Sequence, residues 1–226
     1  IKTRLDAIPS ILKRFRQSVL AAAVSGNLTK ELRKKNNCPH WKSTKLSDLA
    51  NILDPHPSHR TPKEAQGGIP YISIGDLKDD GTIDFEHARK VSSDILFEHK
   101  NRYKLECGDF VFGKIGTLGK ATALPINVEY TLSANVILIQ PNKGVTIPKY
   151  LMYFLSSPST MADIAKQANS TSQAAFGIKK MREFICEIPS IEEQTEIVRR
   201  VEQLFSYADQ IEQRVKDAQA RVNHLT

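Results

Sequence analysis

The clearest pattern of apolar positions lies in the last thirty-odd residues of the chain. There the apolar residues recur in alternating steps of four and three, without a break over four heptads. A lone globular helix repeats its apolar stripe about every 3.6 residues, whereas a repeat of about 3.5 is typical of helices that supercoil around a partner. We therefore expect a coiled-coil helix with apolar positions at Ile197, Val201, Leu204, Ala208, Ile211, Val215, Ala218, Val222 and Leu225.

The sequence also indicates where this helix begins. Ser190 and Glu193 match the S-x-x-E capping box, and Pro189 stands just before it. At about 1.5 Å per residue, a helix from Ser190 to Leu225 is roughly 50 Å long. Such a rod has a narrow apolar face and needs a partner helix. One interpretation is a plain oligomerisation coil, in which the partner belongs to another chain.

A second stripe with the same spacing lies near the other end of the chain. Gly26 ends it, as a residue free to adopt the left-handed conformation does at a helix C-terminus. Pro9 lacks the N–H that a helix interior requires, so it either starts the main helix or breaks a longer one. The apolar positions of this stripe are Leu5, Ile8, Leu12, Phe15, Val19 and Ala22.

We expect these two helices to pack against each other, at least in part, and to run antiparallel. The chain has no initiator Met and opens inside the first stripe, so we expect it to be a fragment or a trimmed chain. The predicted coiled-coil seam consists of Leu12, Phe15, Val19, Ile197, Val201, Leu204, Ile211 and Val215.

Between the two stripes, the signals predict a mixed α and β domain. Pro148 and the pair Ser157-Pro158 each open an expected helix, because Pro is favoured at the first helical position. The expected fold class is α+β, with one mixed domain over residues 37–189 flanked by long helices within residues 1–36 and 190–226 that form an antiparallel coiled coil. Strands are expected at Ile69–Ile74, Asp109–Phe112, Leu132–Gln140 and Phe184–Ile188.

The net charge of +7 is unevenly distributed. Residues 1–36 hold nine Lys/Arg and two Asp/Glu, or +7, and residues 191–226 hold five and seven, or −2, which leaves +2 for the middle. This basic excess favours a polyanionic partner such as nucleic acid. Two alternatives stay open, because the basic arm could be a solvated helix face or could pair with the acidic C-terminal helix.

Other compositional features exclude several classes of protein. Apolar residues make up 40% of the chain, which is enough for a packed core, but none of their runs reaches membrane-spanning length. No signal peptide is visible. Cys38, Cys107 and Cys186 are odd in number and far apart, so they form neither a disulfide framework nor a zinc pattern. These absences favour a cytoplasmic protein with no membrane contact.

Motifs for catalysis or metal binding are incomplete. Gly113 and Gly119 are six positions apart and Ala121 follows the lysine, so the segment fails as a Walker A loop. There is no Asn-Pro-Pro-aromatic tetrapeptide of the kind that adenine methyltransferases carry. We therefore expect no catalytic residue in this chain and no cofactor of its own.

Two weaker patterns have simpler explanations. Glu98-His99-Lys100, with Asp84 upstream, has the E-x-K spacing of a nuclease metal site, but this spacing is common by chance and the segment reads as a surface helix. His56 and His59 lie in a Pro-rich loop with no further ligand at metal-binding spacing, so we expect a solvated loop and no metal ion.

Three polar segments between the regular elements are candidates for DNA contact. Gln can bond adenine bidentately, Ser and Thr can bond base edges or phosphates, and Lys and Arg contact phosphates. The alternative is an ordinary set of hairpin and helix-capping loops with solvated lysines. The candidate residues are Arg60, Thr61 and Lys63, then Lys114, Thr117 and Lys120, and then Ser170, Thr171, Ser172, Gln173, Lys179 and Lys180.

Two long motifs resemble those of a known family. Residues 8–29, beginning Ile8-Pro9-Ser10-Ile11, resemble the central conserved region of specificity subunits of type I restriction–modification systems. Residues 188–205, beginning Ile188-Pro189-Ser190-Ile191-Glu192-Glu193-Gln194, resemble the second conserved region, as do residues 208–212. Shorter patches at 68–72, 75–77, 108–112 and 171–173 are similar to patches of a target-recognition domain.

The resemblance implies a sequence-specific DNA-binding subunit that reads one half of a bipartite target. A full member has two recognition domains, so this chain looks like the second half of a subunit, or a natural half-length subunit that forms a homodimer. The implied partners are double-stranded DNA, modification methyltransferase subunits and restriction subunits. S-adenosylmethionine, ATP and Mg would belong to those partner subunits.

Two hypotheses from other classes remain. The first is a coiled-coil scaffold or regulator without sequence-specific DNA binding, and the second is a solitary nuclease. The resemblance does not indicate which DNA sequence is recognised, because specificity lies in loop geometry.

Overall fold

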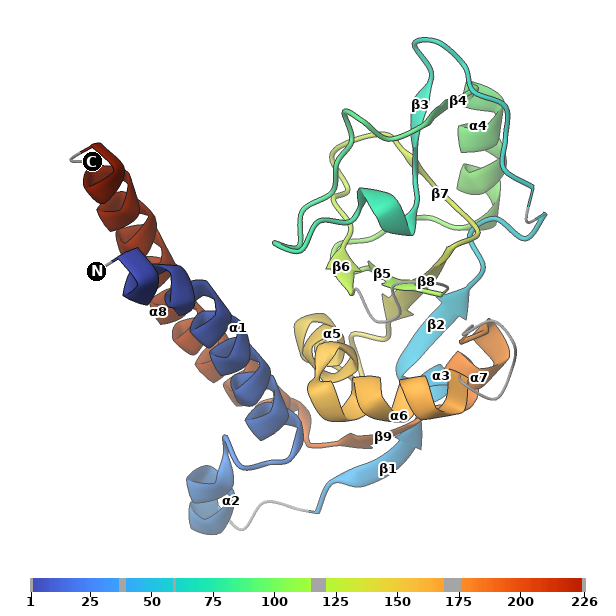
Figure 1. Ribbon diagram of the computed structural model, residues 1–226. Coiled ribbons are helices and arrows are strands. Elements are labelled where there is room, and N and C mark those ends of the chain that lie inside the picture. The colour runs from blue at the N-terminus through green and yellow to red at the C-terminus, as the bar shows by residue number, and fades with distance from the viewer. Residues whose placement is uncertain (1, 37–39, 59, 115–120, 169–175, 225–226) are drawn as a thin grey trace.

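Figure 1 shows the computed structural model of the chain, which describes residues 2–36, 40–58, 60–114, 121–168 and 176–224. Two long helices, α1 (Lys2–Val24) and α8 (Ile191–His224), lie side by side. A body of short strands and helices lies to one side of them. The beginning of α1 and the end of α8 lie at the same end of the helix pair, so the two helices run antiparallel, as predicted.

Polar contacts along the pair follow the same antiparallel order. Arg16 of α1 forms ion pairs with Asp209 (2.6 Å) and Glu212 (2.9 Å) of α8. Nearer the start of α1, Asp6 accepts a hydrogen bond from the Gln219 amide at 3.0 Å. The basic N-terminal arm therefore does pair in part with the acidic C-terminal helix, which was one of the alternatives left open.

The apolar seam is only partly covered by the two helices. Leu12, Val19, Ile197, Val201 and Val215 are buried and Leu204 is half-buried, but Phe15 is 38% and Ile211 46% exposed. Near the body, α5 (Pro148–Ser156) packs on both long helices and α6 (Pro158–Ala168) packs on α1. Phe15 and Ile211 are thus only partly covered, which a continuous seam does not anticipate.

Pro9 lies inside α1 and neither starts nor breaks it. Its position in the second turn is exposed. Water can therefore satisfy the carbonyl four residues earlier, which has lost its helical donor. The predicted start or break at Pro9 is wrong for this reason.

The turn that follows α1 requires glycine. Gly26 has a φ of 74°, in the left-handed region. A Cβ at this position would lie 2.4 Å from Arg33 Nη1 and 3.3 Å from the Trp41 ring. The chain then continues into α2 (Lys30–Asn36), whose Arg33 guanidinium lies 5.6 Å from the Trp41 ring centroid.

A buried carboxylate joins this turn to the start of α8. The Glu193 side chain is 1% exposed and accepts hydrogen bonds from Thr29 Oγ1 at 2.6 Å and Trp41 Nε1 at 3.2 Å. Arg33 Nε lies 3.8 Å from the same carboxylate. Half of the predicted capping box forms, because Ser190 Oγ accepts from the Glu193 backbone at 3.3 Å, while the Glu193 side chain binds these distant partners.

The next residue anchors the body to the same helix end. Gln194 is fully buried, and its Oε1 accepts from the Ile147 backbone at 2.8 Å and from Thr146 Oγ1 at 3.1 Å. Its Nε2 donates to the Pro189 carbonyl at 3.0 Å. Since Ile147 immediately precedes α5, this amide fixes where α5 begins relative to α8.

A two-stranded ribbon connects the helix pair to the body (Figure 1). In it β1 (Lys42–Lys45) pairs antiparallel with β9 (Ile185–Ile188), and Lys42 lies opposite Ile188. The strand at β9 was predicted, whereas β1, with its charged and polar residues, was not.

The body contains two further sheets. The larger has the order β2-β8-β5-β6 and is antiparallel, and the smaller has the order β4-β3-β7, with β3 and β7 parallel. The strands are β2 (Ala50–Leu53), β3 (Ile69–Ile72), β4 (Lys90–Val91), β5 (Phe110–Gly113), β6 (Thr122–Ala123), β7 (Thr131–Leu132) and β8 (Val136–Pro141).

The apolar run of β8 is buried on both faces of the sheet. Ile137 and Ile139 belong to the core shared with the helices, and Val136 and Leu138 belong to a second core with the smaller sheet. Successive strand residues point to opposite faces, so one strand contributes to both cores. The single strand predicted at Leu132–Gln140 is divided into β7 and β8, because Ser133 Oγ accepts from the Asn135 backbone at 3.2 Å and turns the chain.

The remaining described elements are short. They are α3 (Leu46–Leu49), the 3-10 helix η1 (Ile74–Asp76), α4 (Ser93–Arg102) and α7 (Ile178–Glu183). No helix in the described parts of the chain is long and apolar enough to cross a membrane. The boundaries at residues 36/37 and 189/190 stay predictions.

Replacing Val201 with Asp is expected to destabilise the chain by about 3–5 kcal/mol, because it buries an uncompensated charge between α8 and the body. Denaturant unfolding followed by circular dichroism measures this loss. Gln203→Asp, on the exposed side of the same helix turn, should change stability by no more than about 0.5 kcal/mol. Equal losses in the two variants would contradict the burial of Val201.

Replacing Glu193 with Ala is expected to cost about 2–4 kcal/mol, since Thr29 and Trp41 lose a buried acceptor and Arg33 loses its counter-charge. Trp41 is the single tryptophan of the sequence. Its fluorescence should therefore shift to the red as the ring becomes wetter. Glu192→Ala, at the neighbouring exposed residue, is the control. An unchanged Trp41 emission spectrum in Glu193→Ala would contradict the contact between the Glu193 carboxylate and Trp41.

Candidate nucleic-acid interface

Lys114, which follows β5, contacts residues from three separate parts of the chain. Its backbone N–H donates to the Asn135 carbonyl at 2.9 Å, and its carbonyl accepts from the Phe176 backbone at 3.2 Å. Its Nζ forms an ion pair with Asp54 Oδ2 at 3.2 Å. Asp54 follows β2 and Phe176 precedes α7, so residues far apart in sequence meet around Lys114.

The described residues among the predicted DNA contacts differ in their exposure. Arg60, Thr61, Lys63 and Lys179 are exposed. Lys180 is half-buried, and its Nζ donates to the Gln167 carbonyl at 2.6 Å. The predicted residues that lie outside the described parts of the chain are Thr117, Lys120, Ser170, Thr171, Ser172 and Gln173.

The side chain of Lys114 is engaged within the protein. It is 13% exposed, and its partner Asp54 is 17% exposed. Asp54 Oδ1 also accepts from the His56 backbone at 3.1 Å. A phosphate would have to displace a well-shielded carboxylate, so the geometry favours an anchoring role for Lys114, and its phosphate contact stays a prediction.

A polar pocket of about 260 Å³ opens next to this cluster. The exposed Arg89 lies at its wall and donates to the Pro62 carbonyl at 3.3 Å. Sequence reasoning missed Arg89 and Asn135, although the basic pair Arg89-Lys90 was a signal. The lining residues are Thr61, Tyr71, Ser73, Asp76, Arg89, Ser133, Ala134 and Asn135.

The segment that follows β2 is held by a buried pair of histidines. His56 is 3% exposed, so the solvated loop expected at this residue is wrong. Its Nδ1 lies 2.9 Å from His99 Nε2 on α4, and its Nε2 lies 2.8 Å from the Arg60 carbonyl. His99 Nδ1 in turn lies 3.1 Å from the Tyr103 hydroxyl. The local sequence did not show this, since the partner histidine is 43 residues away.

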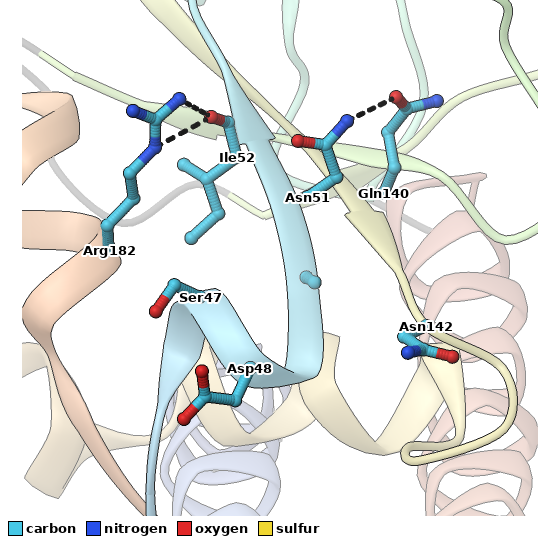
Figure 2. Close-up of a pocket in the computed structure, with 8 residues that line it drawn as sticks. Ser47, Asp48, Asn51, Ile52, Gln140, Asn142 and Arg182 are labelled. Atoms are coloured by element: carbon cyan, nitrogen blue, oxygen red, sulfur yellow. Dashed lines mark hydrogen bonds between the residues drawn. The ribbon is translucent and has the colours of Figure 1, made fainter.

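Figure 2 shows a second pocket, of about 420 Å³, beside the edge strand β2. Arg182 of α7 donates to the Ile52 carbonyl through Nε at 3.1 Å and Nη2 at 2.6 Å, and Asn51 donates to Gln140 Oε1 at 3.4 Å. Among the lining side chains Asp48 is the single carboxylate, and none is His, Cys or Lys. The two hydrogen bonds from Arg182 hold α7, which contains Lys179, against β2.

The nuclease-like spacing has structural uses in the described chain. His99 is buried in the histidine pair, Lys100 forms an ion pair with Glu129 at 2.5 Å, and Asp84 accepts from His87 Nδ1 at 3.0 Å. Hydrogen bonds from the His87 backbone and side chain lower the pKa of Asp84 to about 2. No three His, Cys, Asp or Glu residues of the described ranges are grouped to hold a metal ion.

The fold defines a class of protein: a mixed α and β domain carried on an antiparallel helix pair. Residues 39–219 match the family described as the type I restriction modification DNA specificity domain. The chain belongs to this family.

Curated relatives of this chain are described as type I specificity subunits. The type I restriction enzyme EcoBI specificity subunit of Escherichia coli is 36% identical over 239 residues, covering 100% of this chain and 50% of that protein. The StySPI specificity subunit of Salmonella potsdam is 34% identical over 234 residues, covering 100% and 49%. The chain thus spans about half the length of these relatives.

Solved structures share the fold. The type I restriction–modification S subunit from M. genitalium has a TM-score of 0.58 at 13% identity, covering 99% of this chain and 55% of that chain. The HsdS subunit from Thermoanaerobacter tengcongensis has a TM-score of 0.55 at 16% identity, with the same coverage.

The histidine pair predicts a pH dependence of stability. Burial, and then the neighbouring His56, lower the pKa of His99 from 6.5 to about 4. The unfolded chain binds this proton at a higher pH than the folded chain does. The free energy of unfolding is therefore unaffected by this proton above about pH 6.5 and decreases as the pH falls from 6.5 to about 4.

The expected loss from this group reaches about 3 kcal/mol. Urea unfolding at pH values across that window measures it. His99→Gln keeps a donor and an acceptor but does not titrate, so its stability should fall less over the same range. Parallel curves for the two proteins would show that His99 does not titrate in this way.

Proposed function

We propose that the chain is the target-recognition part of a type I specificity subunit and binds one half of a bipartite duplex DNA target. The family match over residues 39–219 is the observation that carries this proposal. The relatives are about twice as long, so a second recognition domain would read the other half of the target.

The loop cluster around Lys114 supplies groups suited to this task. Lys63 and Lys179 are exposed cations for phosphates, and the guanidinium groups of Arg60 and Arg89 can bond guanine bidentately. By their place in the sequence, the contact set also includes Thr117, Lys120, Ser170, Thr171, Ser172 and Gln173.

The helix pair would serve as a spacer between half-sites. With 34 residues at about 1.5 Å each, α8 is roughly 50 Å long. One turn of DNA is roughly 34 Å, so the pair suits half-sites about one turn apart.

The open side of the helix pair would receive partner subunits. Ile11 and Phe15 of α1 are 50% and 38% exposed, and Tyr207 and Ile211 of α8 are 52% and 46% exposed. Each pair is four residues apart, which places its two side chains on one helix face. We assign this surface to modification methyltransferase subunits, with restriction subunits completing the assembly, or to a second copy if the natural subunit is half-length.

In this proposal the chain by itself neither methylates nor cuts DNA, and S-adenosylmethionine, ATP and Mg bind to its partners. Its body carries a net charge of only +2, so affinity for DNA rises when tethered partners add their own contacts.

A domain exchange tests the proposal. Residues 41–188 are replaced by the matching segment of the EcoBI subunit, and methylation is mapped in a complex with the chain's own methyltransferase partner. The methylated half-site should change while assembly persists. An unchanged half-site would favour a scaffold without sequence-specific binding, and metal-dependent cleavage by the chain alone would favour a nuclease.

Lys63→Ala and Lys179→Ala should each weaken binding to all DNA sequences. Each should also reduce the slope of log affinity against log salt by about one unit, as expected for one lost phosphate contact. Lys149→Ala is the control, because that lysine pairs with Glu202 of α8 beside the helix pair. A salt slope equal to that of the control in both variants would remove these lysines from the interface.

A further inference from the structure

We propose that His99 of α4 is a positioning residue that acts through His56 and holds residues 56–58 and 60–63 in the conformation used for DNA recognition. The link to DNA rests on the proposed function, whereas the positioning itself is a property of the free protein. Neither histidine touches the exposed side chains that would meet DNA.

The hydrogen-bond directions in this network follow from the acceptor at one end. The Arg60 carbonyl can only accept, so His56 Nε2 carries a proton, and in the singly protonated ring Nδ1 is then the acceptor. His99 Nε2 must then donate to His56 Nδ1, and His99 Nδ1 must accept from the Tyr103 hydroxyl. One tautomer of each ring satisfies the whole network.

The network connects the interior of the body to the segment that carries Arg60. His99 is 1% exposed, and His56 also packs edge-on against the Tyr71 ring with centroids 5.6 Å apart. Beyond this buried pair, Ser58 Oγ lies 2.9 Å from His56 Nε2 and accepts from the Arg60 backbone at 3.4 Å. The His56 ring is therefore the point at which α4 determines the course of the chain to Arg60.

Positioning of this kind matters for base recognition. A bidentate contact from Arg to a base needs a defined backbone direction, and a segment ordered before binding does not lose conformational freedom on binding. Loss of this positioning at Ser58, Arg60, Thr61 and Lys63 should therefore reduce discrimination between target and non-target DNA more than it reduces general attraction to phosphates.

Two variants separate this role from simple packing. His99→Leu fills the site with an apolar side chain but leaves His56 Nδ1 without a donor and the Tyr103 hydroxyl without an acceptor. His99→Gln offers one donor and one acceptor and should restore the network. Both variants keep the exposed residues of the proposed interface unchanged.

The first measurement needs no DNA. Side-chain ¹⁵N spectra of His56 and His99 should show each ring singly protonated, at Nε2. Amide hydrogen exchange at Ser58, Arg60, Thr61 and Lys63 should be faster in His99→Leu and normal in His99→Gln. If exchange there is unchanged in a folded His99→Leu protein, or if the rings carry their protons at Nδ1, the positioning role is wrong. Thermal unfolding of each variant verifies that it is folded.

The second measurement compares target and scrambled duplexes in complex with the methyltransferase partner. His99→Leu should lose about tenfold in affinity for the target, which corresponds to about 1.4 kcal/mol, and much less for the scrambled duplex, with recovery in His99→Gln. Equal losses on both duplexes, or no recovery with Gln, would overturn the proposal. If the unaltered chain does not discriminate at all, the proposed function fails, and the hydrogen-exchange result still decides the positioning role.

Discussion

The buried carboxylate of Glu193 is the interaction on which the arrangement of the chain depends. It lies in the first turn of α8, where the helix dipole favours negative charge, and it binds three residues between α1 and β1, namely Thr29, Arg33 of α2 and Trp41. Burial of an unpaired carboxylate is expensive, so the start of α8 at this place depends on that segment. Gln194 extends the constraint to the start of α5.

This junction connects the helix pair to the loop cluster through continuous packing. Val201 of α8 belongs to the same core as Phe110 and Phe112 of β5, and β5 leads directly to Lys114. The Asp54–Lys114 ion pair then joins the segment that follows β5 to the segment that follows β2. In the proposed function, a recognition surface built in this way would keep a fixed relation to the helices, as a spacer between two half-sites would require.

Much of the polar chemistry in the loop cluster is used to hold the loops together. Lys114, Lys180 and Arg182 bind partners within the protein, and Arg60, Lys63 and Lys179 stay exposed. Internal anchoring costs the body part of its positive surface but orders the segments beforehand. In the proposed function, the expected outcome of this balance is specific recognition with modest intrinsic affinity, which partner subunits would raise through contacts of their own.

The sequence by itself determined the two long helices, the end of α1 at Gly26, the starts of α5 and α6, and the family, because periodicity, helix-starting Pro residues and contiguous motifs are local. Only the tertiary structure decided the partners of Glu193, the burial of His56 against His99, and the pairing of Lys114 with Asp54, 60 residues apart. It also decided that Phe15 and Ile211 stay partly exposed. Residue spacing predicted that the two long helices pair, but it does not identify such individual contacts, because they depend on which side chains of distant segments meet.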